Sequence, residues 1–349
     1  MSEGASGGSK IRVLVVDDSA FARKVLREVL AREPRVEVVD IARDGLEALE
    51  KIAALKPDVV TLDLVMPNLD GVGVLQALPA DRRPKILVVS FSDADTELGA
   101  QALQLGALDL VKKPTALATD RMYELSGELL SKVRALAGAH VPPPLPPPEP
   151  EVLPPGAWPA GVSVELVAIG TSTGGPQALT HVLGGLPAEL PVPVAVALHI
   201  PAGYTAALSK RLDSTCAIGV VEAMDGMRLL PGTAYIAPGG QHLKIERRGD
   251  GLFARVGVVP VTTYTPSVDV LFETAVEATG GRVLGVVLTG MGDDGLRGAR
   301  RIHSGGGRLL VESWESCVVY GMPRVVREAG LALDEVKLAE MAHAIVRNL

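Results

Sequence analysis

The sequence predicts an α/β protein with two doubly wound domains, and three features of the chain carry this prediction. Its 349 residues exceed what a single hydrophobic core usually supports. Short apolar runs rich in Val, Ile and Leu alternate with amphipathic segments, which is typical of mostly parallel sheets covered by helices. A proline-rich stretch separates two groups of such runs, so we expect one domain on each side of it.

The first domain is predicted over residues 11–135. The segments 20–34 and 44–57 have the apolar spacing of amphipathic helices. Five strands alternating with helices predict a parallel sheet, and ligands collect at the carboxyl edge of such a sheet. The predicted strands are 11–16, 35–42, 58–63, 85–90 and 107–111.

The second domain is predicted over residues 161–349, after a linker at 136–160. Ten of the chain's 26 prolines fall within residues 141–160, and such a stretch favours an extended polyproline conformation. Turns at 237–240 and 247–251 predict some antiparallel hairpins in the second domain. Its other apolar runs predict strands at 164–170, 191–200 and 282–290 and within 218–258.

Composition narrows the class of protein. The formal net charge of −7 disfavours a nucleic-acid-binding protein, which usually presents a basic face. Cys216 and Cys317 lie far apart and predict neither a disulfide framework nor a cysteine metal site. Residues 1–10 are polar, lack a secretory pattern and are expected to form a flexible tail, and no apolar run is long enough to span a bilayer. We therefore expect a cytoplasmic protein that does not insert into membranes.

Charged side chains follow several predicted strands of the first domain. Asp17 and Asp18 close the first strand, Asp63 closes the third, and Lys113 follows the fifth. Three carboxylates repel one another unless a cation joins them, and all-oxygen ligation suits Mg²⁺. A carboxylate beside such an ion can accept a phosphoryl group whose charge the metal and the lysine offset. The hydroxyl of Ser90, at the end of the fourth strand, is expected to contact the phosphoryl oxygens.

The stretch AIGTSTGGPQAL, residues 168–179, is either a phosphate-binding loop or the site of a nucleophile. A Walker-type loop has a lysine directly after its glycines, and this stretch has none. The glycine spacing does not fit a dinucleotide-binding turn either. Gly170 to Gly174 fits the pattern G-x-S-x-G between a strand and a helix, which indicates Ser172 as a nucleophile. A serine in a glycine-rich helix start remains the alternative interpretation.

A nucleophilic serine requires a base and a group that orients the base. His199 ends the next predicted strand, so we expect it beside the serine, and His242 is a second candidate for the same pocket. Asp293 and Asp294 fall in a glycine-rich loop after another apolar strand, and either can supply the orienting carboxylate. The order serine, histidine, acid differs from that of ordinary α/β-hydrolases, whose acid precedes the histidine.

The motifs of the first domain resemble those of response-regulator receiver domains. They are VLVVDDSAFARKVL, DVVTLDLVMPNLDGV, VVSFSD and GALDLVKKP. The resemblance implies a flavodoxin-like doubly wound (β/α)5 fold with strand order 2-1-3-4-5, and phosphorylation at Asp63. It also implies roles for the surrounding residues, with Asp17, Asp18, Asp63 and the backbone carbonyl of Val65 as metal ligands and Ser90 and Lys113 as phosphate-contacting switch residues.

Nearly all of the second domain resembles the catalytic domain of chemotaxis protein-glutamate methylesterases, the CheB family. The motifs are AIGTSTGGPQAL, ALHIPAGYTAALSKRLD, YIAPGGQHLKI, YTPSVDVLFETAV, VVLTGMGDDGLRGAR and SCVVYGMPRVV. The resemblance implies Ser172 as nucleophile, His199 as general base and Asp294 as the residue that orients it. The backbone N–H of Met291 would contribute to the oxyanion hole. Asp294 is preferred to Asp293 because the family pattern T-G-M-G-x-D-G leaves the position of Asp293 free.

Together the two resemblances imply a phosphorylation-activated hydrolase. It would demethylate glutamyl methyl esters on methyl-accepting chemoreceptors and deamidate specific receptor glutamines, under control of a chemotaxis histidine kinase. The expected cofactor is Mg²⁺, for receiver phosphorylation and not for ester hydrolysis, and the expected state is a monomer. One alternative is a response regulator whose second domain is a catalytically inactive interaction module. Another, an output that binds nucleic acid, would need a basic recognition helix that the sequence lacks.

Overall fold

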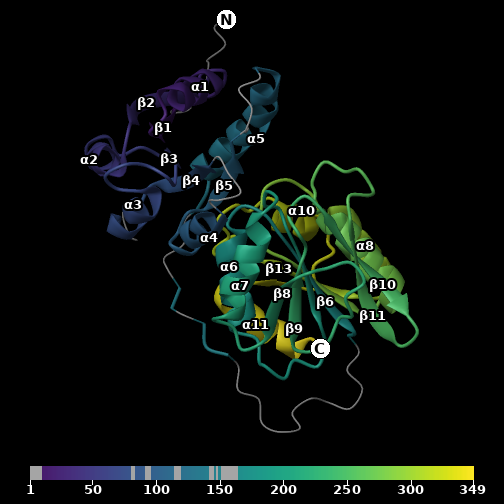
Figure 1. Ribbon diagram of the computed structural model, residues 1–349. Helices are drawn as coiled ribbons and strands as arrows, with labels where there is room; N and C mark the ends of the chain where they lie inside the picture. Colours follow the sequence, from purple (N-terminus) through teal and green to yellow (C-terminus); the bar gives the residue numbers. More distant parts are fainter. Residues whose placement is uncertain are drawn as a thin grey trace, which may run out of the picture. The chain divides into compact units, whose positions relative to one another are not determined.

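The computed structural model describes residues 10–79, 83–90, 96–113, 119–140, 145–146, 148–150 and 164–349, and only the backbone over 119–125. The chain divides between Gly138 and Ala139 into two compact units, each with its own sheet (Figure 1). Most of the predicted tail and linker lies outside the described residues, so their limits stay predictions. In the parts of the chain that are described, no helix combines the length and the apolar character that crossing a membrane requires.

The first unit is a parallel five-stranded sheet in the predicted order β2-β1-β3-β4-β5. The central strands are largely buried apolar runs, because helices cover the sheet. The strands are β1 (Ile11–Val16), β2 (Val36–Ala42), β3 (Val59–Leu62), β4 (Lys85–Ser90) and β5 (Asp109–Lys112). The helices are α1 (Ala20–Leu30), α2 (Gly45–Leu55), α3 (Gly71–Ala77), α4 (Thr96–Gln104) and α5 (Thr119–Ala137).

Side chains that follow the strands begin three of these helices. Ser19 accepts the N–H of Ala22 at the start of α1, and Asp44 accepts the N–H of Glu47 at the start of α2. Asp70 caps α3 in the same way. Such N-caps satisfy backbone donors that the first helical turn leaves unpaired. The strand-to-helix turns at the carboxyl edge of the sheet are thereby fixed.

The second unit contains a parallel seven-stranded sheet in the order β14-β13-β12-β6-β7-β9-β8 and a separate antiparallel hairpin, β10-β11. The predicted class, a doubly wound, mostly parallel domain with some antiparallel strands, is confirmed. The sheet strands are β6 (Leu166–Thr171), β7 (Val194–Leu198), β8 (Gly219–Glu222), β9 (Thr233–Ile236), β12 (Val283–Val287), β13 (Arg308–Glu312) and β14 (Asp334–Val336). The hairpin strands are β10 (His242–Arg248) and β11 (Gly251–Gly257). The helices are α6 (Gly175–Gly184), α7 (Tyr204–Asp213), α8 (Val268–Thr279), α9 (Leu296–Ser304), α10 (Met322–Glu328) and α11 (Leu338–Arg347).

Of the two predicted hairpins, one is present and one is wrong. The turn at 247–251 joins β10 to β11. The turn at 237–240 does not join paired strands, because β9 lies between β7 and β8 and both of its edges are already paired. The chain therefore leaves the large sheet after β9 and starts a second one.

Helix α8 packs against both parts of the second unit. It lies beside β10 of the hairpin (Figure 1). It also contacts β6, β7 and β12 at the centre of the large sheet. Leu271 and Phe272 of this helix are fully buried in the core. This packing fixes the position of the start of α8.

Candidate functional site

Four charged side chains of the first unit meet at the carboxyl edge of its sheet. Asp17 follows β1, Asp63 follows β3 and Lys113 follows β5. Lys113 Nζ lies 2.5 Å from Asp17 Oδ2 and 2.8 Å from Asp63 Oδ2, and all three side chains are buried. With the exposed Asp18, the two aspartates form a group whose carboxylate oxygens lie within 4.8 Å of one another. This donor set fits a hard divalent cation.

The buried charges of this cluster act on Asp63 in opposite directions. Burial raises the pKa of Asp63, the carboxylate of Asp17 adds to the rise, and Lys113 acts against both. The backbone N–H of Leu64 donates to Asp63 Oδ1 at 2.8 Å and fixes the carboxylate. Ser90 is buried at the end of β4, and Val65 is exposed two residues after Asp63. The receiver residues singled out in the sequence therefore lie at the strand ends on one edge of the sheet.

Ser172 and His199 directly follow two neighbouring strands, at the same position in the register of that pair. Thr171 and Leu198 are partners in the parallel register of β6 and β7, and each candidate residue comes directly after one of them. The backbone N–H of His199 donates to Thr171 O at 3.0 Å, which extends this pairing to the end of the strands. The register thus brings the serine and the histidine to adjacent positions.

The turn that carries Ser172 requires small residues. Gly174 has φ +83°, and a Cβ there would lie 2.8 Å from Cβ of Val318. A Cβ on Gly290 would lie 2.8 Å from Cβ of Ser172, so the two backbones approach closely. The N–H of Ser172 donates to Thr289 O at 3.0 Å. The serine is therefore held against the loop that follows β12.

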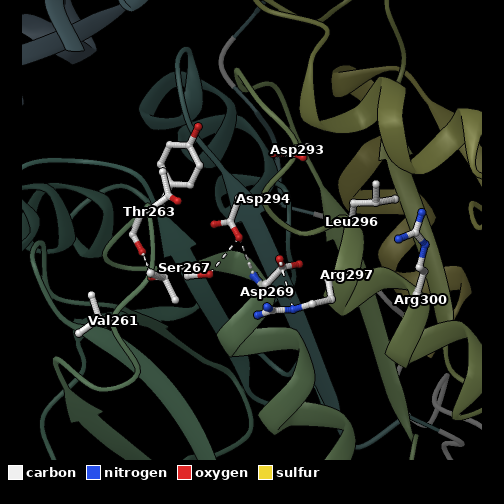
Figure 2. Close-up of a pocket in the computed structure, with 11 residues that line it drawn as sticks. Val261, Thr263, Ser267, Asp269, Asp293, Asp294, Leu296, Arg297 and Arg300 are labelled. Carbon is white, nitrogen blue, oxygen red and sulfur yellow. Dashed lines mark hydrogen bonds and ion pairs between the residues drawn. The ribbon is translucent and has the colours of Figure 1, made fainter. Parts of the chain in front are cut away.

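Asp294 is hydrogen-bonded to the imidazole of His199. His199 Nε2 lies 2.8 Å from Asp294 Oδ2, and the carboxylate is buried. The carboxylate also accepts hydrogen bonds from Ser267 Oγ at 2.9 Å and from the N–H of Asp269 at 3.1 Å (Figure 2). The N–H of Val268 donates to it as well, at 2.7 Å. These donors form the start of α8, where the helix dipole favours a negative charge. Asp294, and not Asp293, contacts the histidine.

These donors keep the Asp294 carboxylate ionised. Burial works to raise the pKa of Asp294, but the hydrogen bond and charge of His199 and the N–H groups of Val268 and Asp269 outweigh it. The pKa therefore lies below its usual value. An ionised acceptor in this place fixes the histidine with Nε2–H as the donor.

The second ring nitrogen of His199 is not bonded to Ser172 or to any other described residue. Nδ1 is buried and has no hydrogen-bond partner among the described residues. The ring of Tyr264 stacks on the imidazole, with centroids 4.4 Å apart and an interplanar angle of 5°. This stacking covers one face of the imidazole and restricts its rotation.

His242, the second candidate base, is engaged in holding the backbone. Its Nε2 donates to Pro260 O at 2.8 Å, and its Nδ1 accepts the N–H of Ser267 at 3.1 Å. Burial lowers the pKa of His242, which agrees with a neutral ring that both donates and accepts. His242 therefore supports the segment that carries Tyr264 and Ser267, and both of its ring nitrogens are engaged there.

Sequence reasoning missed two residues of this site, Ser267 and Tyr264. Ser267 directly precedes the helical run of α8 and has the side chain of an N-cap, so a local signal for its position was present. No local signal places the ring of Tyr264 on His199, because this contact depends on tertiary packing.

The loop after β12 lies against the serine turn and contains Met291. Thr289 Oγ1 donates to Thr173 O at 2.9 Å, and the N–H of Thr289 donates to Glu312 Oε2 at 2.7 Å. Gly290, which approaches Ser172, directly precedes Met291. The loop thus brings the Met291 backbone to the same edge of the sheet as the serine.

Glu312 supports this loop from the interior and leads to a prediction about stability. Burial raises its pKa to about 7, although Thr289 N–H and Ser316 Oγ donate to it. A carboxyl with a raised folded-state pKa favours folding while protonated, and this contribution is lost as the pH rises from about 4.5 to about 7. The loss should be about 3 kcal/mol. We expect Glu312→Gln, which stays neutral, to remove this part of the pH dependence of unfolding.

Denaturant unfolding of the full chain at about pH 5 and about pH 8, followed by tryptophan fluorescence, measures this difference. Glu315→Gln is the matched control, since Glu315 is exposed and pairs with Lys337 at the surface. Equal pH dependence in Glu312→Gln and in the unmodified chain would contradict the prediction.

Two family models match the chain. The model described as CheB methylesterase matches residues 167–345, and the model described as response regulator receiver domain matches residues 13–122. The two matched ranges lie in the two units of the structure.

Named relatives extend the similarity over nearly the whole chain. Protein-glutamate methylesterase/protein-glutamine glutaminase 5 of Myxococcus xanthus is 57% identical over 345 residues, which cover 98% of this chain and 99% of that protein. A protein-glutamate methylesterase/protein-glutamine glutaminase of Bordetella bronchiseptica is 41% identical over 343 residues, 97% of each. The crystal structure of the Thermotoga maritima CheB methylesterase catalytic domain is similar with a TM-score of 0.52 and 37% identity, over 54% of this chain and 100% of that one.

Proposed function

This chain belongs to the CheB methylesterase family, and we propose that it hydrolyses glutamyl methyl esters and specific glutamines of chemoreceptors through Ser172, His199 and Asp294. It is a protein-glutamate methylesterase and protein-glutamine glutaminase with a receiver domain. The hydrogen bond between His199 and the Asp294 carboxylate, at the strand ends beside the Ser172 turn, carries the assignment of residues. It supplies the pairing of base and orienting acid that acyl transfer requires.

The ester is cleaved in two steps. Ser172 Oγ attacks the γ-carbonyl carbon, and its proton passes to His199 Nδ1 while Asp294 stabilises the imidazolium through Nε2–H. The bond to the methoxy oxygen then breaks, and His199 returns the proton to the leaving methanol. Water, deprotonated by His199, attacks the acyl-enzyme and releases the glutamate carboxylate and the serine. An amide follows the same path, with ammonia as the leaving group.

Backbone donors of the loop after β12 stabilise the tetrahedral intermediate. The N–H of Met291 is the proposed donor to the oxyanion, and the close approach of Gly290 to Ser172 supports it. Backbone donors that are fixed before the reaction cost no reorganisation as charge develops. The bonds of Thr289 to Thr173 and Glu312 hold this loop in place.

Asp63 is the proposed phosphoryl acceptor of the receiver. Its carboxylate attacks the phosphorus of a phosphohistidine on a chemotaxis histidine kinase, which forms an acyl phosphate and frees the imidazole. Lys113, which already contacts Asp63, offsets the charge of the transferred group, and Ser90 contacts its oxygens. Mg²⁺, when bound, adds positive charge beside the phosphoryl oxygens. The residues that fit it are the side chains of Asp17, Asp18 and Asp63 and the carbonyl of Val65.

Phosphorylation regulates the esterase by shifting a population between two states of the chain. Asp63→Asn is expected to abolish the stimulation of methanol release by a small-molecule phosphodonor with Mg²⁺, because an amide cannot form the acyl phosphate. Asp58→Asn is the control that should keep the stimulation. Asp58 directly precedes β3, whereas Asp63 directly follows it, so the control changes a carboxylate at the opposite edge of the sheet. Stimulation that persists in Asp63→Asn would rule out Asp63 as the acceptor.

The proposed function is tested by methanol release from methylated chemoreceptor membranes, with and without the phosphodonor. Release that increases with the phosphodonor is the expected result. If neither condition yields methanol, the enzymatic proposal fails and an inactive interaction module becomes the better account.

A further inference from the structure

A pocket of about 370 Å³ lies beside the triad and is not used by the proposed mechanism. Figure 2 shows it between two walls, the segment Val261–Tyr264 on one side and the start of α9 on the other. Ser267, Asp269 and Asp294 lie between these walls. We refer to this space as the α9 groove. It adjoins Asp294 and Tyr264, and both of these contact His199.

The charges between the walls of the groove are compensated within the protein. Asp294 accepts hydrogen bonds from His199 and from the start of α8. Asp269 accepts the N–H groups of Gly295 at 3.0 Å and Gly298 at 2.7 Å. Arg297 Nε lies 2.7 Å from Glu273 Oε1 and 3.7 Å from Asp269 Oδ2. None of these groups needs a ligand to balance its charge.

Two charged side chains at the rim of the groove, Arg300 and Asp293, are exposed. Arg300, one helical turn beyond Leu296, is exposed, lines the groove and forms no ion pair within the described parts of the chain. Asp293, at the other end of the rim, is exposed and directly follows Gly292, where a Cβ would lie 2.9 Å from the hydroxyl of Tyr264. Tyr264 stacks on His199. Asp293 therefore lies at the end of the groove near the triad, and Arg300 lies at the end away from it.

We propose that the α9 groove binds an acidic segment of the substrate protein beside the reacting residue, and that Arg300 pairs with a carboxylate of that segment. The inference rests on the proposed function and adds a specificity residue to it. The reacting side chain is a neutral ester or amide, which tolerates Asp293 nearby. Every completed turnover leaves a glutamate on the same polypeptide, so processed regions gain the carboxylates that a free arginine at the rim recognises.

The test compares kcat and KM for methanol release from methylated chemoreceptor membranes among full-length variants, with phosphodonor and Mg²⁺ present. Arg300→Glu should raise KM roughly fivefold to tenfold with a smaller change in kcat, since it replaces attraction with repulsion at the rim. The difference should shrink at high salt, which screens exposed charges. Arg300→Lys keeps the charge and should restore most of the loss.

Arg301→Glu is the matched control. Arg301 is the next residue of α9 and is exposed, but it does not line the groove, so the same change in net charge should alter KM by less than about twofold. Equal effects of Arg300→Glu and Arg301→Glu, or no effect of either, would overturn the groove proposal. Absence of methanol release from the unmodified chain would contradict the proposed function instead.

Discussion

Replacing Ser172 with alanine is expected to lower kcat for methanol release on the order of 10⁶-fold. The variant lacks the oxygen that attacks the ester, and the remaining groups cannot supply another nucleophile in the same place. Binding of the receptor should persist, because the substitution removes one buried hydroxyl and leaves the α9 groove intact. Single-turnover release of methanol, together with trapping of an acyl-enzyme in the unmodified chain, measures the loss.

A second serine provides the control. Ser209 is buried on α7 of the same unit, outside the site, so Ser209→Ala tests the loss of a buried hydroxyl without the loss of the nucleophile. We expect it to retain most of the activity. If Ser172→Ala released methanol at a rate close to that of the unmodified chain, another group would have to be the nucleophile and the proposed mechanism would fail.

Asp294→Asn is expected to lower kcat about 10⁴-fold. All four groups that contact the carboxylate are donors: His199 Nε2, Ser267 Oγ and the N–H groups of Val268 and Asp269. An asparagine has an NH₂ group in place of one carboxylate oxygen. This group is itself a donor, and it would face the donors that the replaced oxygen accepts from. It would either rotate the imidazole out of position or impose the tautomer with Nδ1–H, and in both cases Nδ1 no longer accepts the proton of Ser172.

The adjacent acid makes this prediction specific. Asp293→Asn removes the same charge from the neighbouring residue, which is exposed and does not bond His199, and should reduce kcat by less than about tenfold. The pH profile of each variant, measured with its kcat, separates a lost base from an altered surface charge. A larger loss in Asp293→Asn than in Asp294→Asn would reverse the assignment of the orienting acid.

The strand ends were the part of both sites that the sequence could predict. Parallel strands finish at one edge, so residues that directly follow apolar runs, such as Asp17, Asp63, Ser172 and His199, had to gather there. The choice of Asp294 over Asp293 needed the family pattern, because both residues occupy the same loop. The catalytic and phosphorylation roles of these residues stay predictions until the variants are measured.

The remaining features depend on contacts between distant segments. The hairpin predicted at 237–240 was wrong because the sequence did not reveal that β9 would be paired on both edges. Strands β13 and β14 were not predicted, and with β13 the buried Glu312 was missed. The stacking of Tyr264 on His199 and the support of Ser267 by His242 join residues that only the packing of α8 and the hairpin brings together.

The order of strands also determines when, during synthesis on the ribosome, the esterase becomes active. Ser172 and His199 follow the consecutive strands β6 and β7. Asp294 lies in the loop after β12, and β12 must first pair with β6 in the sheet. A nascent chain that has emerged only through β7 therefore has a serine and a histidine but no ordered triad. The receiver sheet lies wholly upstream and can fold first, since domains generally fold in the order of their synthesis. The regulatory unit is thus complete before the activity that it regulates exists.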